Sequence, residues 1–169
     1  MTSRTIRERI DAYNGGRDPA RLARKYSAMR TDPFVFFRGS AHLFWEDWAR
    51  DAGPLADAPA AWACGDLHLE NFASFRGDNG LVYFDLNDFD EAALAPAIAD
   101  VTRLLTSTHL AARSLRLSGT DATQLCDVFL DAYIAALMDG KARWVERATA
   151  TGMVRDLLRS AQDRRLPRT

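Results

Sequence analysis

The residues best suited to chemistry lie in one short segment, residues 64–88. Asp66 is followed five positions later by Asn71, and Asp85 comes directly after the apolar residues 81–84. A carboxylate such as Asp66 can accept the proton of an attacking hydroxyl, a task typically worth a factor of ~10²–10⁴ in rate. Asn71 and Asp85 offer hard oxygen ligands of the kind that Mg²⁺ prefers. Together these groups suit Mg²⁺-assisted transfer of a phosphoryl group to a hydroxyl.

A predicted turn brings the separated candidates together. Residues 72–75 and 81–84 are short and apolar, and the Asp-Asn-Gly sequence between them favours a β-hairpin. Because a hairpin reverses the chain, Asn71 and Asp85 are predicted to lie at the same end. We expect both side chains to face one cavity, with Asp66 at its rim.

Several stretches in combination resemble a known family. They are Asp32–Ser40, Cys64–Phe72, Phe84–Glu91 and Asp100–Leu104. Residues from about 26 to 117 are similar to an uncharacterised bacterial domain family with kinase-like motifs, related to the aminoglycoside phosphotransferases of the protein-kinase-like superfamily. The resemblance covers roughly half of the chain, and it is specific only when the stretches are taken together.

The resemblance implies a role for each acidic or amide residue. Asp66 matches the catalytic acid of the loop, Asn71 and Asp85 match metal ligands, and Asp88 matches an acid that supports the metal or binds a second one. Asp100 matches a buried acid that pins the catalytic loop by hydrogen bonds to its backbone. The cofactors implied are Mg²⁺ and ATP.

Two features depart from the family pattern. Cys64 stands where many kinase-like enzymes have His, so one contact that orients the loop is missing. The resemblance also implies a Gly-rich loop and a phosphate-binding Lys that follow the catalytic motifs, and the chain ends at Thr169 before such a segment. Lys25 is interpreted as a solvated helix residue rather than a nucleotide clamp. We therefore expect a partial domain with little or no phosphotransfer activity until the missing segment is supplied, in cis or by a partner chain.

Arg38 is the candidate cofactor-binding residue. It follows four apolar residues, and its planar guanidinium could hold a phosphate by two hydrogen bonds. A structural salt bridge to the acidic segment is an equal alternative.

Three functions remain open. The leading hypothesis is Mg²⁺-assisted transfer of a nucleotide's terminal phosphoryl group to a hydroxyl acceptor of unknown identity. The second is a metal-dependent phosphoesterase, since Asp66, His68 and Glu70 alternate and would share one face of a strand. The third is a truncated kinase-like module that binds a partner without catalysis.

The composition of the chain limits the classes of protein to which it can belong. At 169 residues and 47% hydrophobic content, the chain can build a core. A net charge of −1 and scattered Arg residues give no steering toward nucleic acid or membrane. Cys64 and Cys126 lack metal-ligand spacing, which favours reduced, buried thiols in a cytoplasmic protein. No apolar run long enough for a membrane span and no signal region is found.

Hydrophobic periodicity predicts an α+β, mostly helical chain. It resembles the C-terminal-type catalytic lobe of a kinase-like fold, with a small β-hairpin that carries the site. One partial domain, 1–169, is expected to comprise a helical or extended region over 1–52, a catalytic core over 60–117 and C-terminal helices over 120–160. We expect helices over 3–13, 19–29, 41–51 (capped by Ser40) and 141–160, and a short aromatic strand or extended segment over 34–38. Loops are expected over 53–59 and 92–96, and a frayed tail over 163–169. The four tryptophans are expected to be packed: Trp45, Trp48, Trp62 and Trp144.

Overall fold

Most of the chain is helical, and within residues 4–163 the strands form two small antiparallel sheets. The structure, a computed structural model, describes residues 4–163. The chain divides into two units. The first contains the chain up to His68 together with Phe89–Asp127, and the second contains Leu69–Asp88 together with the chain from Val128 on. The α+β, mostly helical class is therefore confirmed.

Helices make up most of the first unit. They are α1 (Ile6–Tyr13), α2 (Pro19–Met29), α3 (Pro33–Gly39), α4 (Ala41–Asp51) and α5 (Ile98–Ala111), with a short 3₁₀ turn η1 (Gly53–Asp57). Helix α1 begins at a capping box formed by Thr5 and Glu8. Helix α2 begins after Asp18, whose side chain accepts a hydrogen bond from the Arg21 N–H. Such caps satisfy backbone donors that a helix start leaves free.

Helix α3 corrects the expectation of an extended segment over 34–38. Its start repeats the Asp-Pro signal of α2, because the Asp32 carboxylate accepts hydrogen bonds from the Phe34 and Val35 N–H groups and Pro33 occupies the first turn. The predicted cap of α4 is also wrong. The Ser40 hydroxyl makes no cap and donates to the Phe36 carbonyl oxygen at 2.6 Å.

The sheet of the first unit joins segments that are far apart in sequence. Strand β1 (Ala60–Ala63) pairs antiparallel with β4 (Ala93–Pro96), and Trp62 lies opposite Leu94. The expected loop over 92–96 is therefore a strand, formed by a long-range pairing that local pattern does not encode. Trp62 is 80% exposed, so its expected packing is wrong, as it is for the exposed Trp144.

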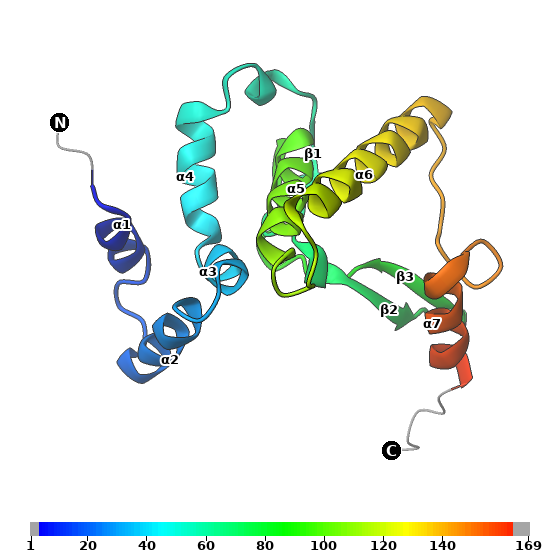
Figure 1. Cartoon of the computed structure of the whole chain (residues 1–169), viewed down its shortest axis with the longest axis horizontal. Helices are drawn as coiled ribbons and strands as arrows, with labels where there is room; N and C mark the ends of the chain where they lie inside the picture. The colour runs from blue at the N-terminus through cyan, green and yellow to red at the C-terminus, as the bar shows by residue number, and fades with distance from the viewer. Residues whose placement is uncertain (1–3, 164–169) are drawn as a thin grey trace. The chain divides into compact units, whose positions relative to one another are not determined.

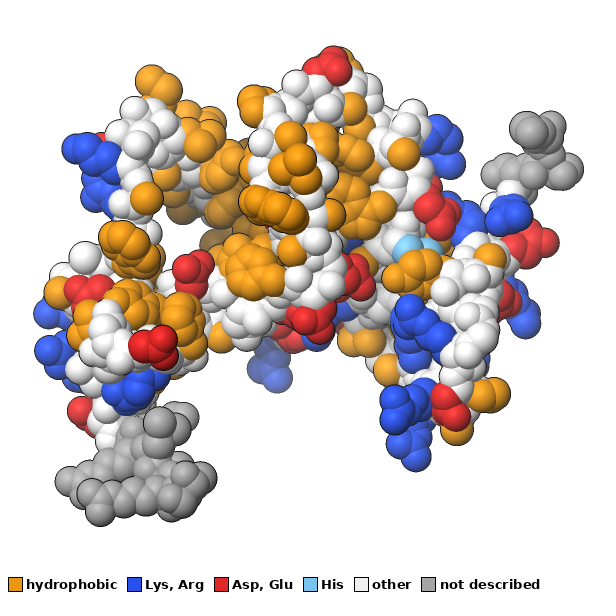
Figure 2. All heavy atoms as spheres, turned by 180° about the vertical axis from the view of Figure 1, so that it is seen from behind, with side chains coloured by type: hydrophobic (Ala, Val, Ile, Leu, Met, Phe, Trp, Pro, Cys, Tyr) orange, Lys and Arg blue, Asp and Glu red, His pale blue; other side chains and the backbone are white. Residues whose placement is uncertain are grey.

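Exposed hydrophobic side chains also occur elsewhere on the molecule. Figure 2 shows hydrophobic side chains interspersed with charged ones on the face that it draws. Single exposed apolar residues are normal at protein surfaces. No helix within residues 4–163 is both long and apolar enough to cross a membrane.

The second unit is built on the predicted hairpin. Strand β2 (Phe72–Arg76) pairs with β3 (Val82–Leu86), and helix α7 (Gly152–Asp163) packs beside them (Figure 1). The fully buried Leu158 of α7 packs against Val82 of the hairpin. This unit therefore gives the hairpin a small core of its own.

The C-terminal helices differ from the expected 120–160 pattern in one place. Helix α6 (Gly119–Asp139) begins in the first unit and continues into the second. The helix expected over 141–160 begins only at Gly152, because Val145 and Glu146 pair with the hairpin instead. The Phe84 N–H donates to the Val145 carbonyl oxygen at 2.8 Å. Residues 164–169 of the predicted frayed tail lie outside the described residues.

Candidate functional site

Asp66 lies in a tight loop directly after β1. Gly65, the preceding residue, has φ of +86°, a conformation that favours glycine. A Cβ atom at Gly65 would also lie 2.1 Å from the Glu91 carbonyl oxygen. The loop therefore requires glycine for two independent reasons. The close approach of the Gly65 backbone to Glu91 fixes the start of the loop that carries Asp66.

Two side chains hold this loop from other helices. Asp100 of α5 accepts hydrogen bonds from the Cys64 N–H at 2.6 Å and the Gly65 N–H at 3.3 Å. This confirms the contact expected for a pinning acid, although Asp100 is half-buried rather than largely buried. Trp45 of α4 donates its indole N–H to the Gly65 carbonyl oxygen at 2.8 Å. The sequence indicated only packing for Trp45, because nothing in its surroundings signals a partner 20 residues away.

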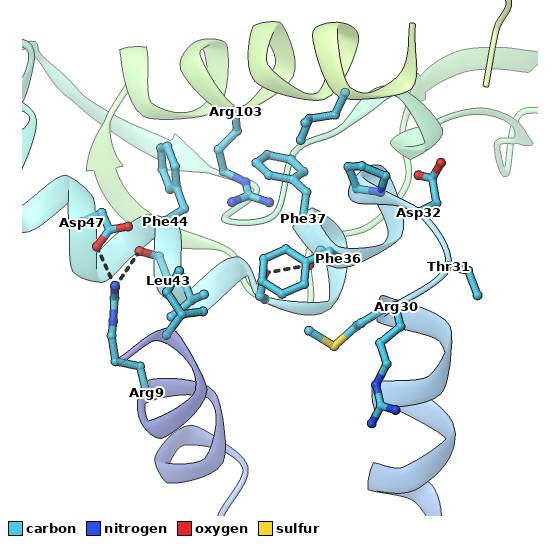
Figure 3. A pocket seen from close by; sticks show the side chains of 15 residues that line it. Arg9, Arg30, Thr31, Asp32, Phe36, Phe37, Leu43, Phe44, Asp47 and Arg103 are labelled. Atoms are coloured by element: carbon cyan, nitrogen blue, oxygen red, sulfur yellow. Dashed lines mark hydrogen bonds and ion pairs between the residues drawn. The ribbon is translucent and has the colours of Figure 1, made fainter. Parts of the chain in front are cut away.

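The Asp66 carboxylate is paired with Arg103 of α5. The side chain of Asp66 is 26% exposed, whereas Arg103 is completely buried and donates Nη2–H to Asp66 Oδ1. Figure 3 shows the guanidinium group between the rings of Phe37 and Phe44. Its Cζ atom lies 4.2 Å from the centre of the Phe37 ring and 4.9 Å from that of Phe44. Sequence reasoning did not single out Arg103, because it lies outside the apolar positions 98, 101, 104 and 105 that predict the buried face of α5.

Burial controls the acidity of Asp66. Desolvation raises the pKa of Asp66 to about 6, and Glu91 adds to this, while the positive charges of Arg103 and Arg38 act in the opposite direction. Burial likewise lowers the pKa of Arg103, against the attraction of Asp66. A carboxyl group with a pKa of about 6 can take up and release a proton near neutral pH, which suits acid–base chemistry.

Two further cations influence Asp66 within the first unit. Arg38 is exposed at the end of α3, with its guanidinium 5.9 Å from the centre of the Phe34 ring. Lys25 is half-buried and donates Nζ–H to Asn14 Oδ1 at 3.4 Å. Burial lowers the pKa of Lys25, assisted by the charge of Arg17, whereas Glu91 and Asp66 oppose that shift.

The structure thus corrects the interpretation of Lys25 as a solvated residue. A signal for this was present in the sequence, since Lys25 lies on the apolar stripe of α2 formed by Leu22, Tyr26 and Met29. A charged residue in such a stripe is directed toward the protein rather than toward water.

The proposed metal ligands Asn71, Asp85 and Asp88 lie in the second unit. Asp85 of β3 pairs with Ala73 of β2, and the Asn87 N–H donates to the Asn71 carbonyl oxygen at 3.0 Å, which continues the ladder. Asn71 itself ends the 3₁₀ turn Leu69–Asn71 directly before β2, so the alternation of side chains along the strand does not apply to it. That both side chains face one cavity stays a prediction, since Asn71 is buried and Asp85 exposed.

The chemistry of these ligands fits Mg²⁺. Asn71 supplies an amide oxygen, and Asp85 and Asp88 supply carboxylates. Asp85 Oδ1 accepts a hydrogen bond from the Leu86 N–H at 2.8 Å, and its Oδ2 makes no hydrogen bond within residues 4–163. No group of three His, Cys, Asp or Glu side chains in this range could hold a metal. Mg²⁺ keeps several waters and takes few protein ligands, and carboxylate and amide oxygens have the chemistry that it prefers.

The phosphoesterase hypothesis depended on a strand that does not form. Asp66 and His68 lie in irregular backbone, and Leu69–Asn71 forms a short 3₁₀ helix, η2. The alternating residues therefore do not share a strand face. His68 is buried and meets the Phe34 ring edge-on, with centroids 5.7 Å apart, as expected for a packing histidine.

A pocket of about 650 Å³ opens beneath Arg103 (Figure 3). Its walls include the aromatic rings of Phe36, Phe37 and Phe44, and Arg9 at one side is ion-paired with Asp47 at 2.6 Å. Asp66 is not among the lining residues, so this pocket is separate from the candidate acid.

Comparison with known proteins identifies one family. A family model described as "Uncharacterized protein conserved in bacteria (DUF2252)" matches residues 17–168. Comparisons with curated proteins and with solved structures give no match. The matched range contains every candidate site residue: Arg38, Asp66, Asn71, Asp85 and Asp88.

Proposed function

Because the chain belongs to the DUF2252 family of proteins conserved in bacteria, we propose a function from its residues: a kinase-like phosphotransferase that transfers the terminal phosphoryl group of ATP to a hydroxyl acceptor. The observation that carries the proposal is the environment of Asp66. Its loop is held by Asp100 and Trp45, its carboxylate is paired with Arg103, and its pKa is raised to about 6.

Asp66 is the proton acceptor in this proposal. The acceptor oxygen attacks the terminal phosphorus, its proton passes to the Asp66 carboxylate, and the bond to the bridging oxygen of ATP breaks to release ADP. A base with a pKa near the working pH is suited to this transfer. The Gly65 turn and the Asp100 hydrogen bonds contribute by holding the carboxylate in place before substrate binds.

The remaining site residues bind the nucleotide. Asn71, Asp85 and Asp88 would hold Mg²⁺, which neutralises phosphate charge when bound. Arg38 is proposed to contact a phosphate group directly, since its exposed guanidinium lies close enough to influence Asp66. The half-buried Lys25 adds positive charge on the same side of the first unit.

The test measures transfer of labelled γ-phosphate from about 10 mM Mg·ATP, a concentration that offsets weak binding, to a library of hydroxyl compounds. We expect slow transfer by the wild-type chain and a ~10²–10⁴-fold lower rate for Asp66→Asn. The matched control is Asp57→Asn, an exposed acid in η1 that should leave the rate unchanged. Equal rates for wild type and Asp66→Asn, or no transfer by the wild type, would contradict the proposal.

A further inference from the structure

Burial of the charged Arg103 side chain is energetically unfavourable. It is completely buried on α5, and its Nε and Nη1 atoms have no hydrogen-bond partner. Within residues 4–163 its hydrogen bond goes to Asp66 through Nη2. Buried N–H donors without acceptors lose their hydrogen bonds to water and gain none within the protein. The position therefore carries an energetic cost that requires an explanation.

Packing alone does not explain the cost. The faces of Phe37 and Phe44 stabilise the positive charge through cation–π interactions, but they accept no full hydrogen bond from the two free N–H groups. An apolar side chain of similar length would fill the same space between the rings without desolvating a charge. Replacement of buried ion pairs by apolar residues is often neutral or stabilising.

The remaining explanation is the effect of Arg103 on Asp66. The charged groups around the Asp66 carboxylate are Arg103, Arg38, Lys25 and Glu91. Among them Arg103 alone is completely buried, because Arg38 and Glu91 are exposed and Lys25 is half-buried. A buried guanidinium held between two aromatic rings has little freedom to change rotamer. Its Nη2 donor therefore stays at one position.

We propose that Arg103 is a positioning residue for Asp66: the ring-clamped guanidinium fixes the orientation of the carboxylate and favours its ionised, proton-accepting form. The inference rests on the proposed function only in treating Asp66 as the reacting group. Arg103 itself is completely buried between the rings of Phe37 and Phe44, and it touches no substrate in this arrangement. Its contribution is to keep Asp66 basic at neutral pH although burial acts against ionisation.

The decisive variant is Arg103→Met, which keeps side-chain length and removes the charge. The carboxyl ¹³C resonance of Asp66, assigned with Asp66→Asn, reports the titration of this group in the full-length chain without any nucleotide. We expect the titration midpoint to rise by about one pH unit or more. A purely structural Arg103 gives a different result: an unchanged titration midpoint of Asp66 in the folded variant.

Two further variants complete the experiment. Arg103→Lys restores the charge without the planar fork, so its midpoint should lie between those of wild type and Arg103→Met. Arg9→Met removes another arginine that lines the pocket of Figure 3 and is ion-paired with Glu46 and Asp47, and it should leave the Asp66 midpoint unchanged. If Arg103→Met does not fold, the Lys variant alone decides the question.

An Asp66 midpoint equal to that of wild type in the folded Arg103 variants overturns the inference. The outcome is independent of the proposed function, because the titration requires no catalysis. A shifted midpoint in a chain that transfers no phosphate would support the positioning role of Arg103 and contradict phosphotransfer instead.

Discussion

The Asp66 carboxyl group experiences two opposing influences. Burial favours its neutral form, and the guanidinium of Arg103 favours its ionised form. Burial is the larger of the two, which is why the pKa rises to about 6 rather than falling. A group balanced in this way changes charge in response to small changes around it, and this property is useful in a proton acceptor.

The first prediction concerns stability and pH. Because the pKa of Asp66 is raised in the folded chain from its ordinary value of 3.8 to about 6, the folded state binds this proton more tightly than the unfolded state. The stabilising contribution is fully present below pH 3.8 and is lost as pH rises through about 6. We expect wild type to lose roughly 2–3 kcal/mol relative to Asp66→Asn across that range.

Urea unfolding of both proteins at a series of pH values measures this difference. If the stability gap between wild type and Asp66→Asn does not change across the range, the environment of Asp66 has been misjudged. The Asp57→Asn variant serves as control, since Asp57 is exposed and should give a constant gap.

The loop that carries Asp66 depends on glycine at position 65. In Gly65→Ala, a Cβ atom would meet the Glu91 carbonyl oxygen at 2.1 Å on a backbone with φ of +86°. We expect a loss of roughly 3 kcal/mol or more in unfolding free energy, from backbone strain and overpacking together. Gly53→Ala is the matched control, because its φ is +53° but nothing lies within 4 Å of the added atom, so only about 1 kcal/mol should be lost. Equal losses in chemical denaturation would show that the close approach to Glu91 is unimportant.

Asp100 connects α5 to the same loop. Asp100→Ala removes the acceptors of the Cys64 and Gly65 N–H groups, and we expect unfolding free energy to fall by ~1–3 kcal/mol. Asp100→Asn keeps one acceptor oxygen and should lose less. A thermal melt in which the Ala variant matches wild type would remove Asp100 from this role.

Elements with local signals could be predicted from sequence, and elements with distant partners could not. The hairpin over 72–86 follows from its turn, and α2 follows from Asp18 and Pro19. Strand β4 exists because it pairs with β1, some 30 residues away, and the segment over 141–151 stays irregular because it bonds to β3. Helix α3 could have been predicted, since the Asp32-Pro33 sequence repeats the Asp-Pro start of α2.

The candidate site shows the same difference between residues with local signals and residues with distant partners. The loop position of Asp66 and the Asp100 contacts were predicted from spacing and resemblance. Arg103 and Trp45 reach the loop from other helices, and no local pattern marks a residue whose partner lies 20 or more positions away. The half-burial of Lys25 could have been inferred from the apolar stripe that it interrupts.

At the scale of the whole molecule, the affinity of the chain for a nucleotide is predicted to be low. The sequence contains neither a G-x-G-x-x-G nor a G-x-x-x-x-G-K-[ST] pattern, and such loops supply backbone donors for phosphates. We expect this chain to bind Mg·ATP with a Kd weaker than ~1 mM, as measured by calorimetric titration. Micromolar binding that disappears in Asp85→Ala would show that residues 4–163 already provide a complete phosphate site.

The central claim about the metal is that Asn71 and Asp85 hold one ion, and binding of Mn²⁺ in place of Mg²⁺ tests it most directly. Paramagnetic Mn²⁺ broadens the NMR signals of nearby amides, and an excess of Mg²⁺ should reverse the effect. We predict broadening at Asn71 and at Asp85–Asp88, lost together in Asp85→Asn. Broadening that is confined to other residues, or that persists in Asp85→Asn, would contradict the account.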